Sequence, residues 1–144
     1  ASTIWTHLAT PVFEQVRESG MGGAAHACEL ETSAYLYLEP GRVNMQEARD
    51  HYGGAAGKEG SRFLYVDLGK GWGPMKLVQW TSSATPTGVS GAPTLATAEK
   101  GKAIVEAAAE NLADFIREFR RLEKGARVDH RVRRPQLPQT PILD

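Results

Sequence analysis

The side chains of this sequence that could do chemistry are concentrated in one stretch, residues 26–33. This stretch contains an imidazole, two carboxylates, a thiol and two hydroxyls, and it lies between a glycine-rich approach and an apolar continuation. The pattern is typical of a loop that enters the first turns of a helix. On such a helix His26 and Glu29 would share a face, whereas Glu31 would point away from His26. Because a histidine can accept and return a proton near neutral pH, we predict that His26 is catalytic and that Glu29 orients it.

Other interpretations of the same stretch stay open. Glu29 and Glu31 would also suit an ordinary first helical turn, where acidic side chains favour the helix dipole. Cys28, the single cysteine of the chain, could form a nucleophilic pair with His26, but their adjacent helical faces give that pair a poor geometry. The sequence therefore leaves the roles of Glu31 and Cys28 undecided.

Composition and charge exclude several classes of protein. The 144 residues suit one domain, and the 17 basic and 17 acidic residues balance, which argues against a general nucleic-acid or anionic-membrane binder. A single cysteine excludes a disulfide framework and a cysteine-based zinc finger, and it is compatible with a reducing cytoplasm. No stretch approaches the roughly 18 consecutive apolar residues of a membrane span. We therefore expect a cytoplasmic protein that binds neither nucleic acid nor membrane.

Two segments resemble signatures of a known enzyme family. Residues 26–33, with the pattern His-Ala-x-x-x-Glu-Thr-Ser before an apolar run, are similar to a signature of the creatininase (creatinine amidohydrolase) family. Residues 91–101 resemble the Gly-Asp-Pro-x-x-Ala-Thr-x-Glu-Lys-Gly segment that opens the last helix of that family. The order and separation of the two segments also fit, so the resemblance extends over most of the chain.

The resemblance implies an α/β fold in which helices are layered on both faces of a mixed, mostly parallel sheet (αβα). It also implies a two-metal centre, but the family's metal motifs, which resemble Glu-x-His-Gly-x-His and Asn-Gly-His, do not occur in this sequence. The other histidines, His7, His51 and His130, have no ligand partner at a recognisable spacing. We therefore expect a C-terminal half that holds no metal itself. A second chain would carry the N-terminal half with its zinc or manganese and complete the fold.

The function that the resemblance implies is metal-dependent hydrolysis of a C–N bond in a small amide or cyclic amide. His26 would shuttle the proton, and Gly22, Gly23 and Trp72 would form part of the wall of the substrate pocket. Creatinine-cleaving relatives carry aromatic and acidic side chains just ahead of the histidine, where this sequence has glycine and alanine, so we expect a different or bulkier substrate. Two alternatives stay open. One is a non-catalytic half with a structural role in assembly, and the other is a ring-opening hydrolase of a keto-sugar or a deformylase of the same family.

The elements that must position these residues follow from patterning. Residues 3–8 are β-branched and aromatic and predict a strand, whose open edge would require the partner chain, within a larger oligomer of such pairs. Helices are predicted over 11–19 and 26–38, and a long helix with one apolar face over 97–122.

The remaining segments predict a hairpin and a tail. Residues 63–68 and 75–80 predict the two strands of the hairpin, with Trp72 at or near the bend. Residues 1–126 would form the half-domain. The arginine- and proline-rich residues 127–144 predict an extended tail, because three prolines forbid a regular helix there.

Overall fold

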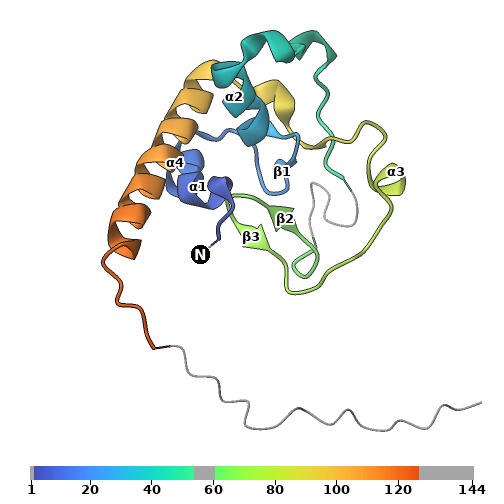
Figure 1. Cartoon of the computed structure of the whole chain (residues 1–144). Coiled ribbons are helices and arrows are strands. Elements are labelled where there is room, and N and C mark those ends of the chain that lie inside the picture. The colour runs from blue at the N-terminus through green and yellow to red at the C-terminus, as the bar shows by residue number, and fades with distance from the viewer. Residues whose placement is uncertain (1, 54–60, 127–144) are drawn as a thin grey trace, which may run out of the picture.

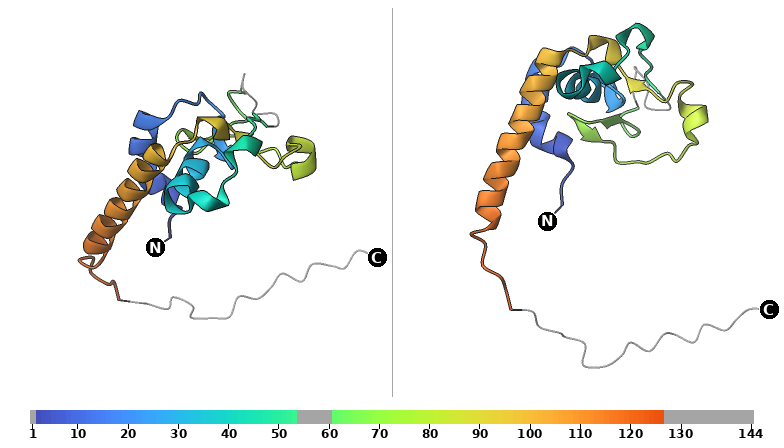
Figure 2. Two further views of the ribbon diagram at one scale, coloured as in Figure 1. Left: turned by 90° about the horizontal axis from the view of Figure 1, so that it is seen from above. Right: turned by 45° about the horizontal axis from the view of Figure 1, so that its top comes forward.

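Three helices form the body of the protein in a computed structural model that describes residues 2–53 and 61–126. They are α1 (Trp5–Val16), α2 (Glu29–Leu38) and α4 (Ala98–Phe119). Helices α1 and α2 both pack against α4, which runs along one side of the molecule (Figure 1). The strands and loops lie away from α4, and the C-terminal turns of α4 project beyond the other helices (Figure 2).

The strands are short, and all of their pairings are antiparallel within the described ranges. β1 (Ala24–His26) pairs with β4 (Ser90–Gly91), and β2 (Val66–Asp67) pairs with β3 (Gly71–Trp72). The described structure is therefore a mixed α/β arrangement that is mostly helical. The predicted mixed, mostly parallel sheet does not form in this part of the chain, because segments predicted as its strands fold otherwise.

Short helical turns occupy the connections. They are η1 (Pro40–Arg42), η2 (Met45–Glu47), α3 (Thr81–Ala84) and η4 (Pro93–Leu95). The turn η4 leads into α4, whose N-cap residue Thr97 accepts a hydrogen bond from the backbone N–H of Lys100 at 3.2 Å. This side-chain cap fixes the residue at which α4 begins.

The segment predicted as a strand over residues 3–8 instead begins helix α1. Thr6, Ala9 and Phe13 recur at spacings of three and four, and all three are buried. Burial of this stripe in the packing of α1 on α4 outweighs the weak strand preference of the β-branched and aromatic residues. Pro11 lies inside α1, so the predicted strand and the helix predicted after it are one element. An open strand edge therefore no longer argues for a partner chain.

The long C-terminal helix is confirmed, but only part of its apolar face is covered. Ile104 and Ala108 are buried in the core, as expected for the inner face of an amphipathic helix. Farther along the same face, Leu112, Phe115 and Phe119 are exposed. The apolar stripe of α4 therefore continues past the body that it packs against.

The predicted hairpin forms, but it is shorter and turns earlier than expected. The carboxylate of Asp67 accepts hydrogen bonds from the backbone N–H groups of Gly69 (3.0 Å) and Lys70 (3.1 Å), which closes the turn immediately after β2. The return strand is therefore β3, and residues 75–80 form no strand. Trp72 lies just after the bend, on β3.

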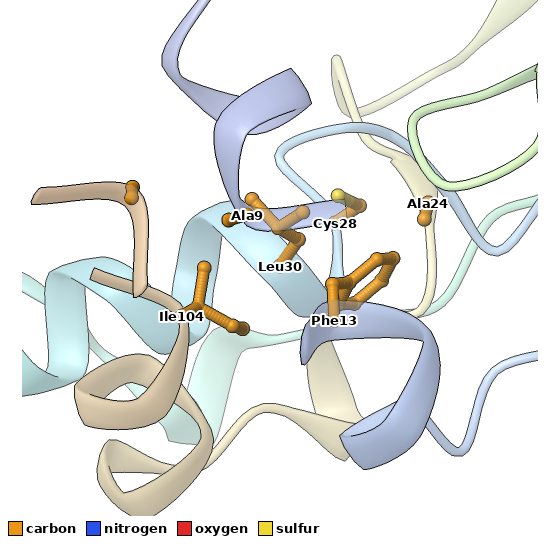
Figure 3. Close-up of a cluster of buried hydrophobic side chains, with 7 residues drawn as sticks. Ala9, Phe13, Ala24, Cys28, Leu30 and Ile104 are labelled. Atoms are coloured by element: carbon orange, nitrogen blue, oxygen red, sulfur yellow. The ribbon is translucent and has the colours of Figure 1, made fainter. Parts of the chain in front are cut away.

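The buried core is small. Figure 3 shows Phe13, Leu30 and Ile104 converging with Cys28 and several alanines. These three are the largest fully buried apolar side chains in the described ranges, and most other buried hydrophobic residues are alanine. Many large hydrophobic side chains are exposed instead, which indicates that apolar surface remains to be covered.

Two sequence predictions fall wholly or partly outside the described residues. The tail predicted over 127–144 lies outside them, and the half-domain predicted over 1–126 keeps its boundaries as a prediction. No helix within the described ranges is long and apolar enough to cross a bilayer.

Candidate functional site

His26 stands at the end of a strand, not on a helix. It is the last residue of β1, Ala27 follows with a left-handed backbone (φ +46°), and α2 begins only at Glu29. A positive φ is unfavourable for a residue with a Cβ, by about 1–2 kcal/mol. The turn at Ala27 leads the chain from β1 into α2 and leaves His26 exposed. The helical face that His26 and Glu29 were predicted to share does not exist.

The side chain of His26 lines an open cavity of about 380 Å³. The other residues on its walls are Ala27, Glu31, Thr32, Tyr35, Arg42, Val43 and Asn44. The His26 imidazole makes no hydrogen bond to any residue that the structure describes. Both of its nitrogens are therefore available to a molecule bound in the cavity.

Sequence reasoning found only part of this cavity. Glu31 belongs to the first signature, but its role was left undecided. Arg42, the last residue of η1, and Asn44, the N-cap of η2, were missed, because no pattern in the sequence brings these two turns beside His26. Tyr35 belongs to the apolar run that follows the first signature, yet it is 57% exposed.

Glu29 was predicted to orient His26, and the structure places its carboxylate elsewhere. Its two oxygens accept the backbone N–H groups of Glu18 and Ser19, each at 2.9 Å, and one also binds the ammonium of Lys100 at 2.7 Å. Burial alone would raise the pKa of Glu29, but the hydrogen bonds from Lys100 and these backbone groups outweigh burial and lower the pKa. Glu29 therefore fastens the start of α2 to α4, and this role leaves no oxygen directed at His26.

The two signature segments pack directly on one another. The hydroxyl of Ser33 accepts the backbone N–H of Thr97 at 3.1 Å. A Cβ added at Gly101 would collide with the backbone of Ser33, so α2 and α4 approach too closely there for any side chain. Together with the ion pair between Lys100 and Glu29, these contacts form an interlock that holds the turn carrying His26.

Gly22 and Trp72, two of the predicted substrate-binding residues, line a separate cavity of about 240 Å³. Ser90, the partner of His26 across the β1–β4 ladder, also lines this second cavity, so the ladder lies between the two. Gly23 is on the wall of neither cavity. It is buried, and a side chain there would collide with Ser19. The structure does not bring these three residues into one cavity with His26.

A buried ion pair anchors the glycine-rich approach. Arg17 binds both carboxylate oxygens of Asp67, at 2.9 and 3.0 Å, and the same carboxylate accepts the backbone N–H of Gly22 at 3.0 Å. Bidentate pairs of this kind are strong and directional. Sequence reasoning missed both residues, because they are 50 positions apart and belong to no signature.

Cys28 has the environment of a core residue. It is fully buried at the N-cap of α2. Burial raises the pKa of its thiol to about 12, and the charge of Glu31 contributes to the rise. Because the thiolate is the nucleophilic form, this environment opposes the nucleophilic pair with His26 that the sequence left open.

The donor groups of the described residues do not by themselves form a metal centre. Among residues 2–53 and 61–126, no group of three or more histidine, cysteine, aspartate or glutamate side chains is placed to hold a metal ion. A site of the kind that zinc or manganese prefers needs such a convergence of ligands.

Comparison with known proteins identifies one relationship. The family model described as "Creatininase: Creatinine amidohydrolase" matches residues 2–116 of the chain. No curated protein and no solved structure matches it. The matched range includes both signature segments and the interlock between them.

Proposed function

The chain belongs to the creatininase family, and on that premise we propose that it forms part of a metal-dependent hydrolase that cleaves a C–N bond of a small amide or cyclic amide. This chain would contribute the proton-transferring His26 and part of the pocket wall. A complementary polypeptide, which carries the metal motifs of the family, would supply the rest of the site. The single buried cysteine is compatible with work in a reducing cytoplasm.

The observation that carries the proposal is the exposure of the His26 side chain, which makes no hydrogen bond to a described residue. It is exposed in a cavity whose walls also carry a carboxylate, a hydroxyl, a guanidinium and an amide. In hydrolysis of an amide, water adds to the carbonyl carbon and the nitrogen leaves with an additional proton. A free imidazole at the substrate can take that proton from water and deliver it to the nitrogen.

The metal ions that the family implies find no convergent set of ligands among residues 2–53 and 61–126, so we assign their ligands to the complementary polypeptide. We propose zinc or manganese, because these ions suit histidine and carboxylate ligands in metal-dependent hydrolases. This chain would contribute proton transfer and part of the cavity wall.

The test is the substitution His26→Ala, measured in the assembled protein. The exposed imidazole makes no hydrogen bond within the described ranges, so its loss should change the free energy of unfolding by less than about 0.5 kcal/mol. Loss of a general acid–base should lower kcat by roughly 10²- to 10⁴-fold. Metal content, melting temperature and kcat are to be measured on one preparation, with the exposed His7 on α1 changed to alanine as the matched control.

Three outcomes separate the possible roles of His26. Loss of turnover with metal and melting retained supports proton transfer. Loss of metal in proportion to activity would make His26 a ligand instead. Unchanged kcat with normal metal would refute the catalytic assignment and favour the non-catalytic, structural half.

The substrate class is to be tested with a panel of small molecules. Creatinine, another cyclic amide, an N-formyl compound and a keto-sugar represent the chemistries in question. The resemblance places aromatic and acidic side chains just ahead of the histidine in creatinine-cleaving relatives, whereas residues 22–25 of this chain are glycine and alanine. We therefore expect a bulkier cyclic amide to be hydrolysed faster than creatinine. Turnover of only the formyl compound or only the keto-sugar would favour the alternative chemistries of the family.

A further inference from the structure

An apolar groove runs between the helices on the outer face of the protein. Its walls carry Trp5 and Leu8 from α1 and Tyr35 and Leu38 from α2, and Val105 and Leu112 of α4 also line it. The groove has a volume of about 510 Å³. Helices α1 and α2, which form its walls, both lie against α4 (Figure 1).

The exposed side chains of this groove are large. Trp5 is 40% exposed, Tyr35 57% and Leu38 60%, whereas the core behind them is built largely of alanine. The apolar stripe continues from the groove along α4 through Phe115 and Phe119. A contiguous apolar surface of this kind marks a site at which another polypeptide packs.

One polar group distinguishes this groove from an ordinary apolar patch. The Oε2 atom of Glu31 is buried and accepts no hydrogen bond from the described residues. A buried carboxylate oxygen without a partner is unfavourable by several kcal/mol, so a donor is expected to approach it in the working protein. Lysine or arginine would satisfy both the hydrogen bond and the charge.

Glu31 also connects the groove to the candidate site. Glu31 and Tyr35 line both the groove and the His26 cavity. A polypeptide seated in the groove would therefore reach the rim of that cavity.

We propose that the groove receives an amphipathic helix of the complementary, metal-carrying polypeptide, and that a lysine or arginine of this helix pairs with Glu31. A helix fits because two helices lying on a third leave a groove into which the ridges of a further helix pack. The charge of Glu31 specifies a basic residue among the apolar ones. The identity of the partner rests on the proposed function, since the groove adjoins the cavity that the complementary polypeptide would complete.

The occupant can be identified by photo-crosslinking in the source cells. A benzophenone side chain replaces Leu38 in the full chain, and a second version carries it at Val78, which is 94% exposed and outside the groove. We expect the Leu38 version to crosslink to a helix of a polypeptide that contains the Glu-x-His-Gly-x-His pattern, and the Val78 version not to do so. Crosslinking to a second copy of the chain, to residues 127–144, to an unrelated protein, or to nothing would overturn the proposal.

The substitution Glu31→Gln tests the charge. The affinity is measured between the purified chain and the partner that crosslinking identifies. There the substitution should weaken binding roughly ten- to hundredfold, because a charge-assisted hydrogen bond is lost. In the chain without its partner, it should leave the melting temperature unchanged or higher. Glu110→Gln, an exposed glutamate on α4 outside the groove, is the matched control. Equal affinity of the Glu31 and Glu110 variants would refute the pairing.

These readouts are independent of catalysis. Specific crosslinking combined with full activity of His26→Ala would refute the proposed function and leave the docking surface in place. Loss of activity in His26→Ala without the expected crosslink would refute the docking surface alone.

Discussion

Replacing Lys100 with methionine should strongly destabilise the protein. Lys100→Met keeps most of the length of the side chain but removes the ammonium that pairs with the fully buried carboxylate of Glu29. Removing one partner of a buried ion pair typically costs about 3–5 kcal/mol. The backbone N–H groups of Glu18 and Ser19 continue to bind the carboxylate and reduce that cost. The carbonyl of Leu95 loses a donor at 2.7 Å, which adds about 1 kcal/mol.

We therefore expect the free energy of unfolding to fall by about 3 kcal/mol near neutral pH. Most of this loss belongs to the pair with Glu29, because the other carboxylate bound by Lys100, that of Glu18, is 64% exposed. Exposed ion pairs contribute less than about 1 kcal/mol. Glu18→Gln, which breaks only the exposed contact, is therefore the matched control.

The loss should depend on pH in a defined direction. The pKa of Glu29 is lowered in the folded protein, so its stabilising contribution is present above the ordinary glutamate pKa and is lost as pH falls through the folded value. In Lys100→Met the carboxylate of Glu29 stays buried but no longer has the ammonium beside it. Protonation of Glu29 should therefore stabilise the variant, whereas it destabilises the wild type. The stability difference between the two proteins should be largest near neutral pH and should shrink below about pH 4.5.

Urea unfolding followed by far-ultraviolet circular dichroism measures this difference, with all proteins in the same assembly state. Comparison of Lys100→Met, Glu29→Gln and the double variant isolates the free energy of the interaction between the two side chains. A difference below about 1 kcal/mol that does not change with pH would refute the role given to the interlock.

Three further predictions follow from other features of the structure. Ala27→Gly should stabilise the protein by up to about 1 kcal/mol in the same assay, because glycine relieves the positive φ; a destabilised variant would show that the turn is not strained. Gly101→Ala should destabilise by about 1–3 kcal/mol, although alanine normally favours a helix interior, because its Cβ would collide with Ser33; unchanged melting would contradict the close approach of α2 and α4. In the assembled protein a chelator should abolish activity while the circular dichroism of this chain alone stays unchanged, since its described residues contain no metal-ligand cluster; full activity after metal removal would exclude the family chemistry.

Elements with a long, regular pattern could be predicted from the sequence. Helix α4 was found because its apolar stripe repeats over many turns, and a period sustained that long has few alternative explanations. The hairpin was found from its flanking strands, but its turn was placed too late. The carboxylate of Asp67 closes the turn through contacts that strand propensity does not describe.

Elements decided by tertiary contacts could not be predicted. Residues 3–8 became helix because Thr6, Ala9 and Phe13 are buried together, a benefit that exists only once α4 is present. The start of α2 was placed too early because nothing in the sequence reveals the left-handed residue at Ala27. His26 was found as a candidate, but its assumed relation to Glu29 depended on that misplaced helix start.

Because the interlock uses residues of both signature segments, a relative that matches these segments shares the contact between α2 and α4, and the match alone does not show that it is active. Several residues of the two segments serve the contact between α2 and α4, among them Glu29, Ser33 and Gly101. A relative that had lost its reaction but kept its fold would still need those residues, so it would still match the family. His26 and Glu31 are different, because neither side chain is engaged by that packing in the described structure. If His26 transfers the proton as proposed, the residue at its position is the one that tells a catalytic relative from a silent one, whereas the residue at position 31 reports on the proposed docking of the partner helix.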